Sequence, residues 1–318
     1  MDAPLPHAVP GVGRGVVTFD PTRTLATLAA RNDIPFDAAF LPTSERLAQR
    51  DGPDLHYLRW SGQRGPLVVL LHGGALTAHT WDLVCMALSP DHRCIALDLR
   101  GHGETAWADS YRIEDQVEDV RALLSHLRER EGDARVHLVG MSLGGNVAGH
   151  VAFTESAQLA SLTTVDIAPG INRDGTVVMR QFLSEATSYP TVDALVEAAQ
   201  TLSPRTDGDL LRYRYHHMTR TDASGWTWRG DRRKHPDFPH IYQRLTELNA
   251  LGDVLTCPML VAVGARSRVL SEEAARDFAG RFRNGRAVTI EGAGHNVQED
   301  NPRALANALR AHFAGAGS

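Results

Sequence analysis

Lysine, cysteine and long apolar runs are all scarce in this chain of 318 residues, and each scarcity excludes something. Almost all of the 33 basic residues are arginine, and Lys234 is the single lysine, which we attribute to codon usage rather than to function. The net charge of −5 gives no reason to expect nucleic acid or an anionic membrane as a partner. No stretch approaches the ~18 apolar residues of a spanning helix, so no membrane span is expected.

The three cysteines, Cys85, Cys94 and Cys257, are scattered and show no CxxC or CxxH spacing. They cannot all pair with one another, and they indicate no metal site. Reduced thiols that fill a core are typical of a cytoplasmic protein. The N-terminus also lacks the basic start and apolar run of a signal peptide. We therefore expect a cytoplasmic protein.

Strands and helices alternate along most of the chain. The continuous apolar runs at 66–72 and 93–99 are typical of strands buried on both faces. Apolar residues at alternating spacings of four and three predict a helix over 113–128. Further strands are expected at 54–62, 135–141, 161–167, 258–264 and 286–292, and further helices at 77–88, 143–153, 271–282 and 301–313. This alternation predicts an α/β fold with a doubly wound, mostly parallel sheet.

Two segments depart from this rhythm. Residues 1–38 are rich in Pro, Gly and Ala, and we expect an arm packed loosely on the surface. Residues 171–250 hold no buried-strand run and are dense in Arg, His and aromatic residues. We expect them to form a mainly helical cap over the carboxyl edge of the sheet. Residues 39–170 and 251–318 then form the core.

The first chemical motif is Gly-Met-Ser-Leu-Gly at residues 140–144, at the end of an expected strand and the start of an expected helix. A serine hydroxyl is a weak nucleophile and must be presented without obstruction. A sharp strand-to-helix turn presents it, and the glycines two residues to either side let the backbone close. The helix N-terminus adds free N–H groups and a positive potential. Ser142 is therefore the candidate nucleophile.

The second motif is His-Gly-Gly-Ala at residues 72–75, directly after an expected strand. Backbone N–H groups in such a loop can face the oxyanion of an acyl-transfer reaction. We assign the two donors to Gly74 and to Leu143, the residue after the nucleophile. His72 is expected to hold the loop by hydrogen bonds.

The third motif surrounds His295, in the loop between the last expected strand and the last helix. A general base must reach Ser142, and a loop at the carboxyl edge of the sheet can bring it there. The chain contains 15 histidines, so the residue type alone is a weak indication. The position after a strand and after Ser142 in chain order favours His295 as the base.

Together with the segment Asp-Leu-Arg-Gly-His-Gly-Glu-Thr at 98–105, these motifs resemble the α/β-hydrolase family over residues 38–316. The resemblance implies a serine nucleophile at Ser142, a base at His295 and a cap that shapes the substrate pocket. It implies no cofactor and no metal. In this family the Arg-Gly-His-Gly segment is usually a structural loop, so His102 is left out of the triad.

The usual place for the third catalytic group lacks an acid. Many family members carry it just after the strand expected at 258–264, and that position aligns with Arg268. A guanidinium group has only donors, so it cannot accept a hydrogen bond from an imidazole N–H. Arg266 and Arg268 are interpreted as a solvated turn, with pairing of one of them to a carboxylate near the pocket as the alternative.

Asp166 is the favoured replacement. It ends the strand that follows the nucleophile's strand, 24 residues after Ser142. Neighbouring parallel strands end on the same edge, so this carboxylate can reach the histidine loop from the other side. A minority of the family, including pancreatic-type lipases and mycotoxin lactonases, is similar in this placement. Glu272, Glu273 and a dyad without an acid are the alternatives.

The cap is expected to set the substrate. Trp226 and Trp228 are two residues apart and share a face in an extended stretch, where they line an apolar pocket or pack the cap onto the core. Gly73 and Met141 are also expected to contact the substrate. The favoured function is a serine hydrolase of carboxylic esters or lactones, acting on a small molecule as a monomer or homodimer.

Two alternatives stay open. A hydrolase of carbon–carbon bonds in ring-cleavage products uses the same triad and needs a basic cap group, for which Arg180 or Arg229 is available. A non-enzymatic ligand sensor on this fold is the alternative from another class. Thioester and amide hydrolysis are also open, whereas haloalkane chemistry is disfavoured because it needs Asp at position 142.

Overall fold

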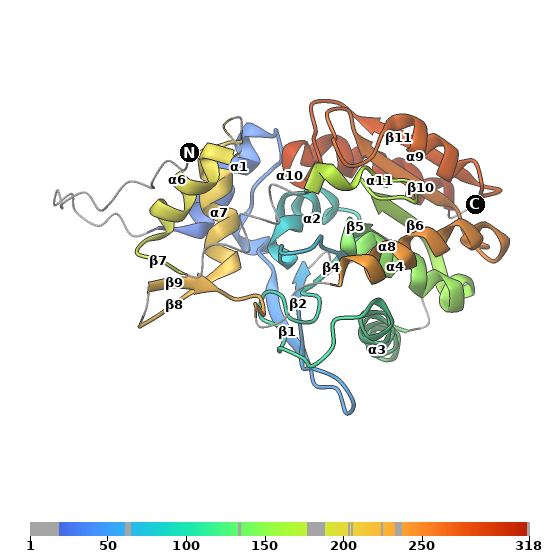
Figure 1. The fold of residues 1–318 in the computed structure, drawn as a ribbon, viewed down its shortest axis with the longest axis horizontal. Helices are drawn as coiled ribbons and strands as arrows, with labels where there is room; N and C mark the ends of the chain where they lie inside the picture. Colours follow the sequence, from blue (N-terminus) through green and yellow to red (C-terminus); the bar gives the residue numbers. More distant parts are fainter. Residues whose placement is uncertain are drawn as a thin grey trace.

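An eight-stranded sheet forms the centre of the molecule (Figure 1). The computed structural model describes residues 19–60, 65–132, 135–176, 188–202, 204, 206–223, 225–232 and 237–316. The strand order is β1-β2-β4-β3-β5-β6-β10-β11, in which β1 and β2 are antiparallel to their neighbours and the others run parallel. The strands are β1 Thr43–Leu47, β2 Leu55–Trp60, β3 Leu67–Leu71, β4 Arg93–Leu97, β5 Val136–Met141, β6 Leu159–Val165, β10 Met259–Gly264 and β11 Gly285–Ile290.

Helices cover both faces of this sheet, as a doubly wound fold requires. Along β3, Val68 and Leu70 belong to one apolar cluster and Val69 belongs to the other, because successive side chains of a strand point to opposite faces. One cluster includes α1 Pro21–Arg31, α2 Asp82–Leu88 and α11 Pro302–Ala316; the other includes α3 Ile113–Glu131, α4 Leu143–Glu155 and α9 Glu272–Ala279. The predicted fold class and mostly parallel sheet are confirmed.

The N-terminal segment differs in part from the predicted loose arm. Residues 1–18 lie outside the described residues. Residues 21–31 form α1, in which Leu25, Leu28 and Ala29 are buried. Asp20 caps this helix by accepting the N–H of Arg23, and Pro21 occupies the first turn, where its missing N–H costs nothing. Residues 21–31 thus form a docked helix.

The inserted segment contains helices α6 Val192–Leu202 and α7 Gly208–Met218 together with a small sheet of order β7-β9-β8. The strands of this sheet are β7 Ser188–Tyr189, β8 Thr219–Asp222 and β9 Gly225–Trp228. Arg31 at the end of α1 forms ion pairs with Asp207 and Asp209 at the start of α7. In Figure 1 these elements gather at one end of the molecule, beside α1.

Helix α8 Phe238–Glu247 packs with the core instead of with α6 and α7. Leu245 and Leu248 join the apolar cluster of α3 and α4. Asn146 of α4 donates to the Ile241 carbonyl at 3.0 Å. We therefore propose an end of the inserted unit before α8, in place of the predicted boundary at residue 250.

Candidate active site

Ser142 occupies a tight turn between β5 and α4, with φ +50° and ψ −115°. The flanking residues Gly140 and Gly144 have no room for a side chain. A Cβ on Gly140 would lie 2.2 Å from the Gly144 carbonyl oxygen, and one on Gly144 would lie 2.4 Å from the Leu71 carbonyl oxygen. The Ser142 N–H donates to the Val165 carbonyl at 3.1 Å, which ties the turn to β6. The local sequence therefore builds a tight strand-to-helix turn that carries the half-buried Ser142.

Two backbone N–H groups lie beside this turn. The loop after β3 is joined to α4 by a hydrogen bond from the Gly144 N–H to the His72 carbonyl, 3.1 Å long. A Cβ on Gly74 would lie 4.0 Å from Leu143 Cδ2, so these two residues are neighbours. Across the described ranges, neither the Gly74 nor the Leu143 N–H has a hydrogen-bond acceptor. Both are available to a developing oxyanion.

Gly73 and Met141 pack against each other beside Ser142. A Cβ on Gly73 would lie 2.5 Å from Met141 Sδ and 3.3 Å from Ser142 Cβ. Met141 is 1% exposed, and Gly73 is also buried. The two residues are therefore tightly packed next to Ser142, and direct contact with a substrate stays a prediction for both.

His72 holds the loop in a single tautomer. Its Nε2 accepts the Leu99 N–H at 3.0 Å, so Nδ1 carries the proton and donates to the Gly73 carbonyl at 2.7 Å. Burial, together with nearby His102, lowers the pKa of His72 to about 3. A neutral His72 therefore braces the loop, as expected. The His102 ring lies edge-on to it, 5.1 Å between centroids.

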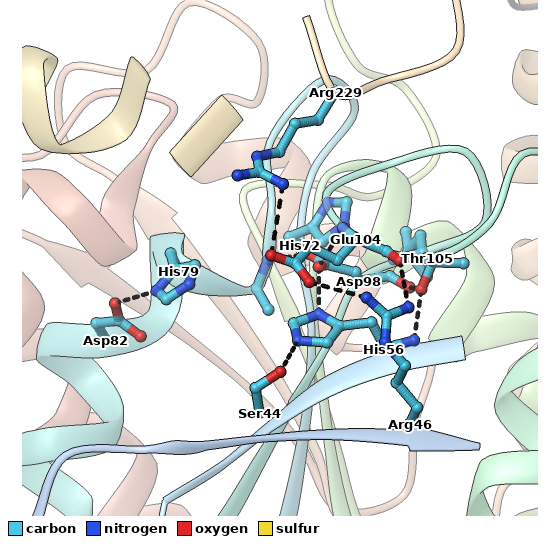
Figure 2. A network of polar contacts seen from close by, with 12 residues as sticks. Ser44, Arg46, His56, His72, His79, Asp82, Asp98, Glu104, Thr105 and Arg229 are labelled. Carbon is cyan, nitrogen blue, oxygen red and sulfur yellow. Dashed lines mark hydrogen bonds and ion pairs between the residues drawn. The ribbon is translucent and has the colours of Figure 1, made fainter. Parts of the chain in front are cut away.

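Asp98 anchors the other end of the same loop (Figure 2). One carboxylate oxygen accepts the Ala78 N–H at 2.6 Å; the other accepts from His56 Nδ1 at 2.7 Å and from the Glu104 N–H at 2.9 Å. Burial raises the pKa of this carboxyl, but the His56 hydrogen bond and the two histidines outweigh it and lower the pKa to about 2. From the sequence alone, Asp98 was not recognised as the anchor of this loop, although its position directly after a buried strand was a signal for it.

His295 is paired with Asp166. The distance from His295 Nδ1 to Asp166 Oδ2 is 2.7 Å. Asp166 is fully buried and His295 is 28% exposed on its side chain. Since a carboxylate only accepts, Nδ1 carries the imidazole proton, and Nε2 has no partner within the described residues. This leaves Nε2 free to take a proton from a nucleophile.

The other candidate carboxylates are elsewhere. Glu272 and Glu273 are exposed in the first turn of α9, and Glu272 pairs with Arg276 at 3.2 Å. Neither contacts His295. Of the acids considered from the sequence, the structure brings only Asp166 to the histidine.

Residues 68–308 match the model of the alpha/beta hydrolase family. This chain belongs to that family. Esterase Rv0045c of Mycobacterium tuberculosis is 31% identical over 262 residues, which are 80% of this chain and 84% of the relative. Its crystal structure superposes with a TM-score of 0.71 at 29% identity, covering 93% of this chain and 98% of that one. A probable protein phosphatase methylesterase 1 of Caenorhabditis elegans is 26% identical over 294 residues, 90% of this chain and 78% of the relative.

The turn after β10 carries the catalytic acid in many alpha/beta hydrolases, but here it holds two arginines and a serine. Arg266 and Arg268 are exposed and form no ion pair with any described residue. Ser267, between them, donates its hydroxyl to Asp166 Oδ2 at 2.5 Å. The solvated turn expected for the arginines agrees with the structure, whereas the contribution of Ser267 was missed.

The cap tryptophans share a face of β9, as predicted, but differ in exposure. Trp228 is 6% exposed and packs against Tyr215, with 6.0 Å between ring centroids. Trp226 is half-buried and lies beside His216, 5.9 Å between centroids. Packing of the cap therefore accounts for Trp228. A substrate contact stays a prediction, and it is better suited to Trp226.

Arg229 is already engaged. Its Nε donates to the Thr219 carbonyl at 2.8 Å, and Nη1 lies 3.4 Å from Glu104 Oε1 (Figure 2). Its carbonyl accepts from Trp107 Nε1 at 2.9 Å. These contacts join the cap to the loop after β4. Arg180, the other basic group considered from the sequence, lies outside the described residues.

Helix α7 docks the cap beside the oxyanion loop. Asp82 accepts from His79 Nδ1 at 2.7 Å and from the Tyr213 hydroxyl at 2.6 Å, and the His79 ring stacks on His217 at 3.5 Å. Burial lowers the pKa of His79, but Asp82 outweighs it and the pKa is raised. Burial and the nearby His79 keep the pKa of His217 well below its usual range. The pKa values of the two stacked rings are thus shifted in opposite directions.

A second contact joins α7 to the histidine loop. Arg214 forms a buried ion pair with Glu299 of α10 Val297–Asp300, the short helix that follows His295. Glu299 also accepts from the Thr80 hydroxyl at 2.8 Å. Helix α7 is therefore tied both to residues 79–82, which follow the Gly74 loop, and to the short helix that follows His295.

The three cysteines are unpaired and buried, as expected for core-filling thiols. Among the described residues, no group of three or more His, Cys, Asp or Glu side chains has an arrangement suited to a metal ion. Within the same residues, none of the helices combines the length and apolarity needed to cross a membrane.

Proposed function

We propose that this protein is a serine hydrolase that cleaves a carboxylic ester or lactone through an acyl-enzyme. The contact that carries the proposal is the hydrogen bond of 2.7 Å between His295 Nδ1 and the buried carboxylate of Asp166. It supplies the orienting acid that the turn after β10 lacks, and it leaves Nε2 to act as the base.

In the proposed reaction, Ser142 Oγ attacks the substrate carbonyl while His295 Nε2 takes the hydroxyl proton. The oxygen that becomes negative is held by the N–H groups of Gly74 and Leu143. Collapse of the tetrahedral intermediate expels the alcohol, which receives the proton from His295. Water then attacks the acyl-serine with His295 as base, which releases the acid and restores Ser142. The imidazolium formed in each half is stabilised by Asp166.

Two relatives support an ester as the substrate class. The M. tuberculosis relative is called an esterase, and the C. elegans relative a probable methylesterase. We propose that the cap, through α7 and the half-buried Trp226, closes over a small apolar acyl or alcohol group. The carbon–carbon hydrolase is less favoured, because Arg229 is engaged by Glu104 and the Thr219 carbonyl. The non-enzymatic sensor is less favoured because the Asp166 contact gives His295 the orienting acid that the proposed triad needs.

Labelling with a fluorophosphonate tests this function directly, since the reagent needs an activated serine. The wild type is expected to be labelled and to hydrolyse p-nitrophenyl butyrate. Ser142→Ala is expected to lose both properties while keeping its melting temperature. Equal hydrolysis by the wild type and Ser142→Ala would remove the proposed nucleophile. An inert wild type that binds small esters without turnover would favour the sensor.

A further inference from the structure

The turn after β10 contributes a hydroxyl to the acid, although it contributes no carboxylate. Ser267 Oγ donates to Asp166 Oδ2 at 2.5 Å. The same oxygen accepts from His295 Nδ1 at 2.7 Å. The serine and the histidine therefore share one oxygen atom of the acid.

The direction of the Ser267 hydrogen bond is fixed by its surroundings. Its Oγ accepts the backbone N–H of Val269 at 3.1 Å and that of Leu270 at 3.2 Å. A hydroxyl has two acceptor positions and one proton. With both positions used, the proton of Ser267 is left for Asp166. Within the turn Arg266 to Leu270, the group that contacts the Asp166 carboxylate is therefore a hydrogen-bond donor, the Ser267 hydroxyl.

The acid depends on such donors. Asp166 is fully buried, and a buried carboxylate is stable only when hydrogen bonds replace its hydration. Its Oδ1 accepts the Gly264 N–H at 3.0 Å. Its Oδ2 accepts from two side chains, Ser267 and His295. The orientation of His295 depends on the position of this oxygen, and the Ser267 hydroxyl helps to hold it. Rotation of the carboxylate would move the imidazole away from Ser142.

We propose that Ser267 is a positioning residue for the catalytic acid, which holds Asp166 Oδ2 in the place where His295 Nδ1 meets it. This inference rests on the proposed function, because it requires Asp166 to be the acid of a working triad. Ser267 takes no part in proton transfer. It acts on His295 through Asp166.

The test compares Ser267→Ala with Ser267→Thr, which keeps the hydroxyl. Ser271→Ala is the matched control: it removes a hydroxyl that caps α9 in the same turn and does not touch Asp166. The rate of p-nitrophenyl butyrate hydrolysis is measured from pH 5 to pH 9. In Ser267→Ala, kcat is expected to fall about 10- to 100-fold with little change in KM, as for a small misplacement of a catalytic group.

The pH profile separates positioning from a general structural role. Without the Ser267 donor, Asp166 stabilises the imidazolium more strongly, so the acid limb of kcat/KM is expected to move to higher pH in Ser267→Ala. Ser267→Thr should restore both kcat and the limb, and Ser271→Ala should leave both at wild-type values. Wild-type kcat in Ser267→Ala, or a loss of rate with an unmoved acid limb, would overturn the inference.

Two further measurements keep the result decisive. Should Ser267→Ala not fold, Ser267→Cys offers the same comparison with a weaker donor and a similar shape, and wild-type behaviour there overturns the inference. Fluorophosphonate labelling of the wild type and of Ser142→Ala is run alongside. An unlabelled wild type would overturn the proposed function and this inference together. A labelled wild type, combined with a Ser267→Ala variant whose kcat and pH profile are unchanged, would overturn this inference alone.

Discussion

Ser142 and Asp166 leave adjacent strands side by side, and both residues have a positive φ angle. The residues before them, Met141 and Val165, are register partners in β5 and β6. The angle φ is +50° at Ser142 and +54° at Asp166. Four non-glycine residues of the described part have positive φ, and three of them, Ala75, Ser142 and Asp166, belong to the candidate site. Uncommon backbone conformations are thus concentrated at the residues proposed to form the oxyanion loop, the nucleophile and the acid.

Asp166→Asn is expected to lower kcat about 10⁴-fold, because an amide at this position favours the wrong imidazole tautomer. Steady-state kinetics on p-nitrophenyl butyrate measure the effect. Glu272→Gln is the control, since Glu272 is exposed and contacts Arg276 instead of His295. An Asp166→Asn enzyme of nearly wild-type activity would exclude Asp166 as the acid.

Gly73→Ala is expected to reduce kcat about 100-fold, because the added Cβ would meet Met141 Sδ at 2.5 Å and push the oxyanion loop away from Ser142. The double variant Gly73→Ala/Met141→Ala removes the obstructing side chain and should recover part of the rate. Kinetics and melting temperatures of both variants provide the measurement. Equal rates for the single and double variants would show that the obstruction is not the cause.

Asp98→Asn is expected to destabilise the protein in a pH-dependent manner. The pKa of Asp98 is about 2 in the fold against 3.8 ordinarily, so the stabilisation from its charge is fully present above about pH 4 and is lost as the pH falls towards 2. The shift corresponds to about 2 kcal/mol, of which about half is lost by pH 3. Urea unfolding at pH 7, 4 and 3 should show the wild type and Asp98→Asn converging on acidification. A constant difference would contradict this assignment.

Arg214→Met is expected to cost about 3–5 kcal/mol, because it leaves the Glu299 carboxylate buried without its partner. Replacing both residues, as Arg214→Met/Glu299→Leu, should recover most of that loss. Arg212→Met is the exposed control, since the pair of Arg212 with Asp193 is solvent-accessible and contributes less than about 1 kcal/mol. Denaturant unfolding of the three variants measures these differences, and an equal cost for Arg212 and Arg214 would argue against a buried link between cap and core.

Trp228→Ala is expected to change mainly the stability of the protein, and Trp226→Ala mainly its KM. Trp228 is 6% exposed, so its truncation should lower the free energy of unfolding by about 3–5 kcal/mol. Trp226 is half-buried, so its truncation should raise KM for aromatic esters with a smaller change in stability. Unfolding curves and KM for phenyl and butyl esters give the comparison. Unchanged KM for every ester in Trp226→Ala would leave both residues as packing groups.

The elements that position the catalytic groups could be predicted from the sequence because strands buried on both faces leave continuous apolar runs. The run at 66–72 became β3, and the chemistry-bearing residues follow directly after such strands. Asp166 was identified by the same rule, as the carboxylate that ends a strand next to the one before Ser142. The position after a strand is therefore the signal that makes Ser142 the predicted nucleophile and Asp166 the predicted acid.

Ser267 could not be found in this manner. Its role depends on how the turn after β10 closes, with two backbone N–H groups directing its hydroxyl towards a residue 101 positions away. The small cap sheet was missed for another reason, because strands of two to four residues are too short to show a period. The packing of α8 against α4 is likewise a property of tertiary contacts.

Ser267 and His295 both donate to Asp166 Oδ2, and this arrangement bears on which positions in the chain can supply the acid for the histidine. The turns after β6 and β10 approach one carboxylate from two sides, so a side chain at position 267 already reaches the point where the acid is needed. A carboxylate at position 267 would therefore meet Asp166 there, and two such carboxylates would hold one proton between them. The turns after β6 and β10 are thus two alternative places in the chain for a single acid beside His295.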